Sequence, residues 1–562
     1  MNMRILVAIC ASGLCYAVTA ETRLQLRVPM RDGVVLRANL FRPPGDGRFP
    51  TILVRTPYGK GKAINPGYQA YVDRGYAVLT QDVRGRYDSG GEFNAWQQEG
   101  PDGNDTLDWI ARQSWSNGKV GMIGGSYVGI VQWKAALQNN PHLKAIFPVV
   151  SGYDDYRDRF YSTGGAFKLG HRLSWMADNL RAAGFVPVDL QKYIWHLPIN
   201  TADTASTGQR NDLYFQPGIS HPTFDAYWKS MSVRENLDKI KVPVFSVGGW
   251  YDNFAQSDLE AFSALRTASK KAFTVIGPWP HNMSIPFPGV DFGPHSTFPV
   301  LRVQLEWFDH WMKDKEFHRA PLRIFVMGRN EWRDEQEWPL RRAKLTPLYF
   351  SSKGYANTVY GNGELVRRPP LRDLSDKFTY DPMKPVQTLG GAVCCNPKIF
   401  PWGPMDQRPV EQRKDVLVYT SQPLKHNMEV TGPIRVQVYV STSALDTDFT
   451  AKLVDVFPDG TARNLTDGLL RLRYRNSLEK PVLAIPGEVY AISIDAGVTS
   501  NVFLPGHRIR VEISSSNFPR FDRNLNTGRS LTTETEIRAA QQTVRHSRKY
   551  PSHILLPVIP TR

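Results

Sequence analysis

A serine between glycines stands where the sequence changes from a short apolar run to a helical pattern. Residues 120–123 predict a buried strand, and residues 127–137 predict a helix. Ser126 lies between them, in the run Gly-Gly-Ser-Tyr-Val-Gly at 124–129. A serine on a tight strand-to-helix turn has its hydroxyl exposed at the top of a sheet, an arrangement called a nucleophile elbow. The spacing is one residue looser than the usual G-x-S-x-G, so an ordinary glycine-rich turn is the alternative.

Two further side chains complete the set that a serine nucleophile requires. A base must take the hydroxyl proton, and a carboxylate must hold that base in the right tautomer. In sheet-based hydrolases the order along the chain is serine, acid, histidine, and here it is Ser126, Asp252, His281. Asp252 and His281 each follow an apolar run that predicts a strand. Taken singly they could be a helix N-cap and a surface loop residue, but together they predict a triad for acyl transfer.

The stretches that would position this triad alternate between strand and helix. Apolar runs stand at 51–54, 76–80, 120–123, 144–150, 242–247 and 272–276, with helical patterns at 68–74, 105–112, 127–137 and 259–266. Such alternation predicts βαβ units and a parallel sheet, in which reactive groups collect at the carboxyl ends of the strands. Residues 21–150 and 238–344 therefore predict one α/β domain, with Ser126 at such a strand end.

Two other parts of the chain follow different patterns. Residues 151–237 lose the alternation, are rich in aromatic side chains and arginines, and predict a helical cap inserted into the α/β domain. After about residue 344 the hydrophobic period changes to two, as at Ile434, Val436, Val438 and Val440. This pattern predicts an antiparallel sandwich over 345–562, in the form of a jelly roll. A length of 562 residues likewise indicates several separate cores.

The amino-acid composition and residues 1–20 indicate which binding partners and which cellular location to expect for this protein. A net charge of +16 could suit nucleic acid, but the basic residues are scattered, so we expect diffuse surface charge and no nucleic-acid partner. Residues 1–20 combine Arg4, an apolar stretch and a small-residue cleavage site, which predicts a signal peptide and a secreted or periplasmic protein. No later stretch approaches the ~18 apolar residues that a membrane span needs.

Cleavage of residues 1–20 would leave Cys394 and Cys395 as the cysteines of the mature chain. These neighbours could form a vicinal disulfide in an oxidising compartment, although adjacent Cα atoms lie only ~3.8 Å apart, below the usual disulfide range. Two reduced, buried thiols are the alternative. Because no other cysteine and no histidine stands near them in the sequence, we expect no metal site.

Motifs at several separated places resemble those of one enzyme group. They are Thr-Pro-Tyr at 56–58, Asp-Val-Arg-Gly-Arg at 82–86, Gly-Gly-Ser-Tyr at 124–127, Gly-Gly-Trp-Tyr-Asp at 248–252, Gly-Pro-Trp-Pro-His at 277–281, Gly-Pro-Met-Asp-Gln at 403–407, Asp-Thr-Asp-Phe-Thr at 446–450 and Asn-Phe-Pro-Arg at 517–520. Together they resemble the cocaine-esterase-like hydrolases, which include X-Pro dipeptidyl-peptidases, α-amino acid ester hydrolases and glutaryl-cephalosporin acylases. The resemblance covers essentially the whole mature chain. It implies an α/β-hydrolase domain, an inserted helical cap and a C-terminal jelly roll.

The resemblance also implies roles for further residues. Tyr58 would donate its phenol to the oxyanion, with the backbone N–H of Tyr127 as the second donor; such a donor is worth about 10²–10³ in rate. Phe160, Trp175 and Phe254 match positions that enclose the acyl group in the esterases, although aromatic residues of a cap are often simply core. The amino-acid ester hydrolases take a substrate ammonium with carboxylates, one from the start of the cap. The nearest positions here, Arg159 and Phe160, lack that charge, and Asp154, Asp155 and Asp158 lie close but out of register. An α-amino substrate is therefore disfavoured but not excluded.

The sequence therefore predicts a secreted serine hydrolase that cleaves an ester or amide bond of a small molecule or short peptide through an acyl-enzyme. A carboxylic-ester hydrolase or acylase is the first expectation, and an X-Pro dipeptidyl-peptidase is the alternative within the enzymes. An inactive scaffold with a carbohydrate-binding jelly roll is the alternative outside them. We expect neither a metal nor an organic cofactor. The natural substrate stays open, and so does assembly into a homo-oligomer.

Overall fold

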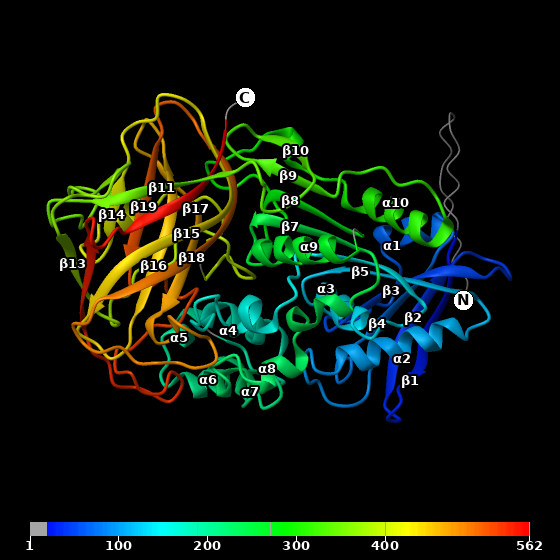
Figure 1. Ribbon diagram of the computed structural model, residues 1–562. Helices are drawn as coiled ribbons and strands as arrows, with labels where there is room; N and C mark the ends of the chain where they lie inside the picture. The colour runs from blue at the N-terminus through cyan, green and yellow to red at the C-terminus, as the bar shows by residue number, and fades with distance from the viewer. Residues whose placement is uncertain (1–18, 188, 270, 400, 561–562) are drawn as a thin grey trace.

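The computed structural model describes residues 19–187, 189–269, 271–399 and 401–560. The predicted signal peptide lies outside these residues except for its last two positions. Figure 1 shows a sheet flanked by helices in one half of the molecule and a β-rich part in the other, with short helices of the cap beside both. Within the described ranges, no helix combines the length and the apolar character needed to cross a membrane.

The first sheet has ten strands in the order β1-β2-β4-β3-β5-β6-β7-β8-β9-β10. Pairing is parallel from β4 through β9 and antiparallel at both ends. The strands are β1 (Glu21–Pro29), β2 (Val35–Arg42), β3 (Phe49–Thr56), β4 (Ala77–Asp82), β5 (Ser116–Gly125), β6 (Leu143–Val149), β7 (Val244–Tyr251), β8 (Ala272–Pro280), β9 (Leu322–Val326) and β10 (Glu331–Glu335).

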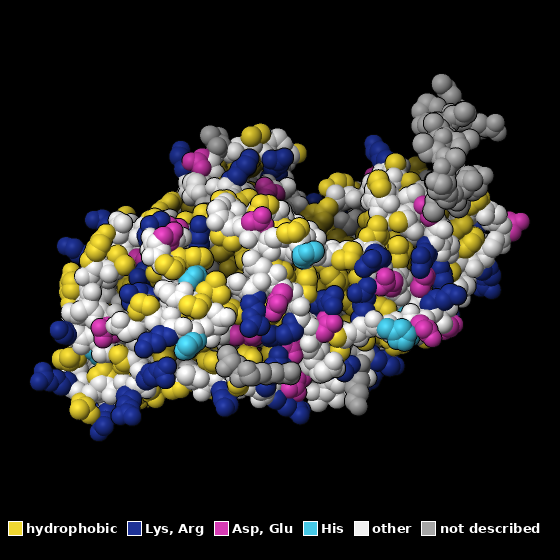
Figure 2. All heavy atoms as spheres, turned by 90° about the horizontal axis from the view of Figure 1, so that it is seen from above, with side chains coloured by type: hydrophobic (Ala, Val, Ile, Leu, Met, Phe, Trp, Pro, Cys, Tyr) yellow, Lys and Arg dark blue, Asp and Glu magenta, His cyan; other side chains and the backbone are white. Residues whose placement is uncertain are grey.

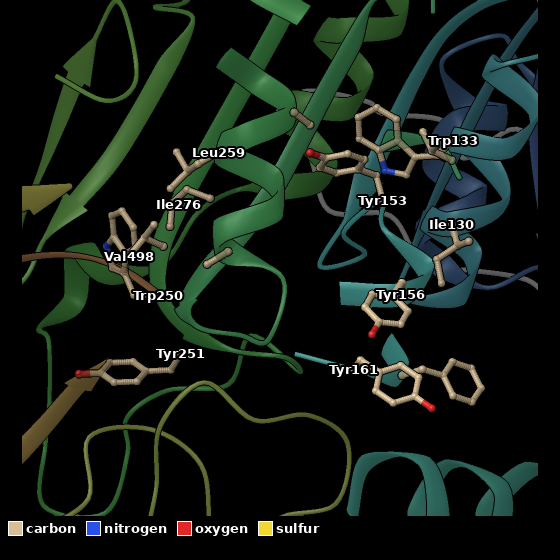
Figure 3. Close-up of a cluster of buried hydrophobic side chains, with 14 of the residues drawn as sticks. Ile130, Trp133, Tyr153, Tyr156, Tyr161, Trp250, Tyr251, Leu259, Ile276 and Val498 are labelled. Atoms are coloured by element: carbon tan, nitrogen blue, oxygen red, sulfur yellow. The ribbon is translucent and has the colours of Figure 1, made fainter. Parts of the chain in front are cut away.

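Helices cover both faces of this sheet, which explains why the central strands are mostly buried on both sides and do not alternate between buried and exposed residues. They are α1 (Pro66–Asp73), α2 (Glu99–Ala111), α3 (Tyr127–Ala136), α9 (Ala255–Ser269) and α10 (Val300–Lys313). Side chains of α1 and α10 join one buried cluster, and those of α2, α3 and α9 join another. Figure 3 shows part of the second cluster, where Trp133 of α3 packs against Tyr153 with 5.9 Å between ring centroids.

The cap lies between β6 and β7 and consists of short helical segments. They are η1 (Asp155–Phe160), α4 (Leu169–Asn179), α5 (Leu190–Ile194), η2 (Ile199–Thr201), α6 (Ala202–Thr207), α7 (Phe215–Ser220), α8 (Ala226–Met231) and η3 (Arg234–Lys239). The chain just before α4 is bonded to the C-terminal part: Gly164 O accepts from the Arg471 N–H, and Asp522 accepts from the Phe167 N–H. From the α/β domain, Arg86 donates to Asn179 O at the end of α4 at 2.9 Å, so the cap is held from both halves of the molecule.

The C-terminal part forms an eleven-stranded sheet whose path runs β13-β20-β15-β21-β11-β12-β14-β19-β16-β17, with β18 paired to β15. Its elements are β11 (Lys344–Ser351), β12 (Glu364–Val366), β13 (Leu374–Tyr380), α11 (Arg408–Glu411), β14 (Leu417–Thr420), β15 (Met428–Thr442), β16 (Asp448–Val456), β17 (Ala462–Arg471), η5 (Leu472–Tyr474), β18 (Tyr490–Phe503), β19 (Arg508–Ser514), β20 (Ala540–His546) and β21 (His553–Ile559). A short segment, η4 (Pro294–Ser296), precedes α10.

The predicted α/β fold with an inserted helical cap and a C-terminal β domain is confirmed. The jelly-roll topology stays a prediction. As to the expected boundaries, β9 and β10 still belong to the first sheet, and the second sheet begins with β11 at Lys344. Lysine and arginine side chains are spread over the face shown in Figure 2 and form no continuous patch there, in keeping with diffuse surface charge.

Candidate active site

Ser126 occupies the turn between β5 and α3. Its φ is 55°, in the left-handed region that a residue other than glycine rarely adopts. Its own N–H donates to Val149 O at 2.9 Å, so the turn is tied to the neighbouring strand β6. The elbow predicted from the apolar run and the glycines is therefore present, with the serine directly before the first turn of the helix.

Two glycines make this turn possible. Gly124 has a φ of +135°, and a Cβ there would lie 2.1 Å from Cγ1 of Val128. At Gly129 a Cβ would lie 2.5 Å from Cβ of Ser151. Both distances are far below van der Waals contact, so neither position accepts a larger residue without movement. The second glycine of the looser motif is therefore required where α3 packs against Ser151, just beyond β6.

The structure brings Ser126, His281 and Asp252 together from three strand ends. His281 Nε2 lies 3.1 Å from Ser126 Oγ, and His281 Nδ1 lies 2.9 Å from Asp252 Oδ1. Asp252 is buried, whereas 13% of the His281 side chain is exposed. The imidazole thus faces solvent on one edge, while the carboxylate that orients it is shielded.

A second carboxyl group lies behind Asp252. Burial raises the pKa of Asp258 well above its usual value, and the negative charges of Asp252 and Asp158 raise it further. Two buried carboxylates close together cannot both ionise readily. The raised pKa of Asp258 favours the neutral form of this carboxyl group behind Asp252.

Tyr58 follows β3 and faces Ser126. Burial of the phenol raises its pKa, and hydrogen bonds with Trp175 and Ser126 act in the opposite direction. Trp175 Nε1 donates to the Tyr58 oxygen at 3.1 Å, so the phenol's own proton stays available for another acceptor. Tyr58 is therefore a neutral hydrogen-bond donor next to the serine.

The backbone of Tyr127 and its side chain point to different places. Its N–H is the first of α3, where helical N–H groups lack partners within the helix. Its hydroxyl instead donates to the buried Glu99 Oε1 at 2.7 Å, beneath the turn. The N–H beside Ser126 and the phenol of Tyr58 are thus the two donors that an oxyanion could find here.

Of the predicted pocket residues, Trp175 and Phe254 border the triad, and Phe160 lies farther back. The ring of Phe254 is 5.5 Å from that of His281, and Trp175 stacks on Tyr127 with 6.1 Å between centroids. Phe160 packs against Trp96, Tyr214 and Trp228 instead.

Two further aromatic residues of this site, Trp96 and Tyr214, were not predicted from the sequence. We call the surface that they form with Tyr127, Trp175 and Phe254 the aromatic wall. Tyr214 stacks on Trp175 at 4.9 Å, and Trp96 stacks on Tyr127 at 6.1 Å. Neither residue carries a motif: Trp96 lies in a loop after the Asp-Val-Arg-Gly-Arg run, and Tyr214 is one of many aromatic residues in the cap. Their positions depend on how the cap folds over the sheet.

Two buried arginines lie against the aromatic wall. Arg172 donates to the Tyr214 hydroxyl at 2.7 Å and bonds the ring of His171; in the described part of the chain it forms no ion pair with a carboxylate. Arg159 pairs with Asp155 and lies 5.9 Å from the ring centroid of Phe254. Asp155 neutralises Arg159, so Arg172 is the cation on this side that has no paired carboxylate among the described residues.

Cys394 and Cys395 form a disulfide, so the first of the two alternatives holds in this structure. The expectation that no histidine is near them is wrong in space: a ring nitrogen of His171 and both sulfurs lie within 4.8 Å of one another. His171 was not singled out from the sequence. A signal existed, because it stands four residues before Trp175 and so shares its helical face.

Two family models match the chain. Residues 32–283 match the X-Pro dipeptidyl-peptidase (S15 family), and residues 316–555 match the X-Pro dipeptidyl-peptidase C-terminal non-catalytic domain. The chain is 40% identical to a cocaine esterase of Rhodococcus sp. (strain MB1 Bresler), over 95% of this chain and 97% of that protein.

Solved structures resemble the whole chain as well. An aminopeptidase from the marine sediment archaeon Thaumarchaeota archaeon superposes with a TM-score of 0.85 at 25% identity, covering 99% of each chain. An α-amino acid ester hydrolase superposes with a TM-score of 0.84 at 26% identity, covering 98% of each.

Proposed function

Because the chain belongs to the X-Pro dipeptidyl-peptidase (S15) family of serine hydrolases, we propose that it cleaves carboxylic esters by acyl transfer through Ser126, His281 and Asp252. One observation carries this proposal: Ser126 Oγ lies 3.1 Å from His281 Nε2, and His281 Nδ1 lies 2.9 Å from Asp252 Oδ1. These distances are those at which a base can take the serine proton.

The steps follow from the positions of the groups. Ser126 Oγ attacks the acyl carbon while His281 Nε2 takes its proton, and the negative charge on the carbonyl oxygen meets the Tyr58 phenol and the Tyr127 N–H. His281 then gives the proton to the leaving oxygen, and the alcohol departs. Water repeats the sequence on the acyl-enzyme, releases the acid and restores Ser126. Asp252 keeps the imidazole in the required tautomer and stabilises its charged form.

An ester is favoured over an X-Pro peptide by the charges around the site. An X-Pro dipeptidyl-peptidase substrate has an N-terminal ammonium near the bond that is cleaved. The side chains packed on the aromatic wall include Arg172, a buried cation without a paired carboxylate among the described residues, which repels such a group. Aromatic surface from Trp175 and Phe254 suits an uncharged acyl group instead. The high similarity to a cocaine esterase supports the same choice.

A matched substrate panel tests the proposal. We expect kcat/KM for p-nitrophenyl butyrate to exceed that for butyryl-p-nitroanilide by at least about 10²-fold, because an amine leaving group depends more on proton transfer. Faster turnover of an X-Pro-p-nitroanilide than of the ester would contradict the ester assignment and favour the peptidase. Ser126→Ala is the control, and it should lose activity on every member of the panel.

We further propose that the protein is exported after removal of residues 1–20. The basis is the charge, apolar stretch and small-residue site in that segment. N-terminal sequencing of the protein recovered outside the cytoplasm should begin at Glu21. Recovery of the intact chain from the cytoplasm alone would contradict export.

A further inference from the structure

The bonded cysteines and His171 come from two different parts of the molecule and meet beside the proposed active site. His171 lies on α4 of the cap, and the cysteines lie in the long loop between β13 and α11 of the C-terminal part. His171 and Cys394 are buried, whereas Cys395 is partly exposed. The cluster is therefore enclosed on one side and open to small reagents on the other.

The three side chains can act as metal ligands when the two cysteines are reduced, but not when they form a disulfide. Thiolate sulfur, and not disulfide sulfur, is the metal ligand. Two thiolates and one imidazole, completed by water, make a Cys₂His set that suits a tetrahedral ion. An ion at the His171 ring must displace the Arg172 guanidinium, which lies 2.9 and 2.6 Å from the two ring nitrogens. With Zn–S at about 2.3 Å, two bound thiolates stand about 3.8 Å apart, so the sulfurs must first be released from their bond. The nitrogen and the sulfurs already lie within 4.8 Å of one another.

The cluster is joined to the oxyanion donor through one helix. His171 and Trp175 are four residues apart on α4 and so occupy the same face. Trp175 Nε1 donates to the Tyr58 oxygen at 3.1 Å. Cys395 is held at a φ of 92°, a backbone conformation that a residue other than glycine rarely adopts. A change at the cysteines that moves His171 would therefore move the residue that positions Tyr58.

We propose that Cys394, Cys395 and His171 form a redox-controlled site for a thiophilic divalent metal ion, whose binding lowers hydrolase activity through α4. In the disulfide form the site takes no metal. A dithiol reductant supplies two electrons and two protons, becomes a disulfide itself and leaves two free thiols. Zn²⁺ or Cd²⁺ then binds, and the two thiol protons are released. The effect on activity rests on the proposed function, but the binding of metal does not.

Metal binding is tested on the full chain in both redox states. Protein reduced with dithiothreitol and desalted without air is titrated with Cd²⁺, and the ultraviolet thiolate-to-cadmium charge-transfer band is recorded. We expect one ion bound per reduced chain, none at this site in the oxidised chain, and release on reoxidation. Equal binding by both forms would overturn the site, and so would no binding by protein whose freed thiols have been titrated.

Variants test whether the metal binds at Cys394, Cys395 and His171 or at other groups of the chain, such as Cys10 and Cys15. The double variant Cys394→Ser/Cys395→Ser should lose the charge-transfer band, and a band of unchanged strength would place the metal elsewhere. His171→Gln should keep both thiols and bind Cd²⁺ at least about tenfold more weakly, since even partners of a metal ligand contribute that much. Unchanged affinity in His171→Gln would remove His171 from the site.

Coupling to catalysis is measured on the same samples. In reduced wild-type protein, kcat/KM for p-nitrophenyl butyrate should fall in proportion to metal occupancy and recover with a chelator. The double cysteine variant should not respond to the metal. Metal bound with activity unchanged would overturn the coupling. Absence of activity in every form would contradict the proposed function and leave the binding result standing.

Discussion

The phenol of Tyr58 links the aromatic wall to the nucleophile. It accepts a hydrogen bond from Trp175 and faces Ser126. Although 38% of Tyr58 is exposed, desolvation of the phenol raises its pKa above the ordinary value near 10, so the group is neutral and can donate. A donor fixed in advance at the place where negative charge develops costs no reorganisation during the reaction. We therefore propose that Tyr58 acts on the transition state more than on the bound substrate.

Replacing Tyr58 by phenylalanine tests this role. We expect kcat for p-nitrophenyl butyrate to fall about 10²–10³-fold in Tyr58→Phe with KM changed little, because one oxyanion donor is lost and the aromatic surface stays. Tyr87→Phe is a matched control, since 64% of Tyr87 is exposed, and it should behave like the wild type. A kcat for Tyr58→Phe within a few-fold of the wild type would show that the phenol is not a donor.

At the residue scale, the sequence predicted the groups whose chemistry imposes an order along the chain. Ser126, Asp252 and His281 follow strands and keep the serine, acid, histidine order, so they could be found together. Trp96 could not, because a buried tryptophan in a loop has no pattern of its own. The contact between His171 and Cys394 was equally hidden, since it joins two segments that no local periodicity relates.

At the scale of elements, Gly129 allows α3 to pack closely against Ser151. A Cβ there would lie 2.5 Å from Cβ of Ser151 and 2.9 Å from its Oγ. In a helix, alanine is favoured over glycine by about 1 kcal/mol, whereas overpacking a tight contact costs about 1–3 kcal/mol. The steric cost of the added methyl group therefore outweighs the gain in helix propensity.

Gly129→Ala should thus lower the free energy of unfolding, measured by urea denaturation. Adding Ser151→Gly should restore part of the loss, because it removes the two nearest atoms that the new Cβ would meet and leaves only the Gly124 carbonyl oxygen at 3.3 Å among the three nearest. Gly125→Ala is the control: the nearest atom to its Cβ would be 3.4 Å away, so its effect should stay below about 1 kcal/mol. A Gly129→Ala protein as stable as the wild type would refute the steric account.

The elements themselves were predictable to different degrees. The central strands are buried on both faces, so they appear as continuous apolar runs, and β4 and β7 are buried throughout. The cap helices α5 to α8 are short, and their apolar residues pack on several partners, so no single helical stripe marks them. The order of the strands in the second sheet depends on long-range pairing, which alternation alone does not specify.

At the scale of the whole molecule, the C-terminal part holds the cap helix that borders the active site. Arg471, fully buried, lies between Asp448 and Asp522 with contacts of 2.9 Å to each. Asp522 also accepts the Phe167 N–H, and the Pro519 carbonyl accepts the Gly170 N–H at the start of α4. A β domain without any residue of the triad therefore positions α4, and with it Trp175 next to Tyr58.

Arg471→Met should lower the free energy of unfolding by about 3–5 kcal/mol, because it leaves two buried carboxylates without their cation. Activity of the folded fraction should fall as well, since α4 loses its support. Arg341→Met is the control, as the Arg341 side chain is 90% exposed and its ion pair contributes little. Equal thermal stability of the two variants would show that the buried ion cluster does not hold this junction.

Covalent labelling of the serine tests the central claim most directly. Full-length protein treated with a fluorophosphonate should gain one adduct by intact mass spectrometry, and peptide mapping should place it on Ser126. The adduct should be missing from Ser126→Ala and form more slowly in Asp252→Asn. Labelling that persists in Ser126→Ala, or a folded wild-type protein that takes no label, would contradict the account.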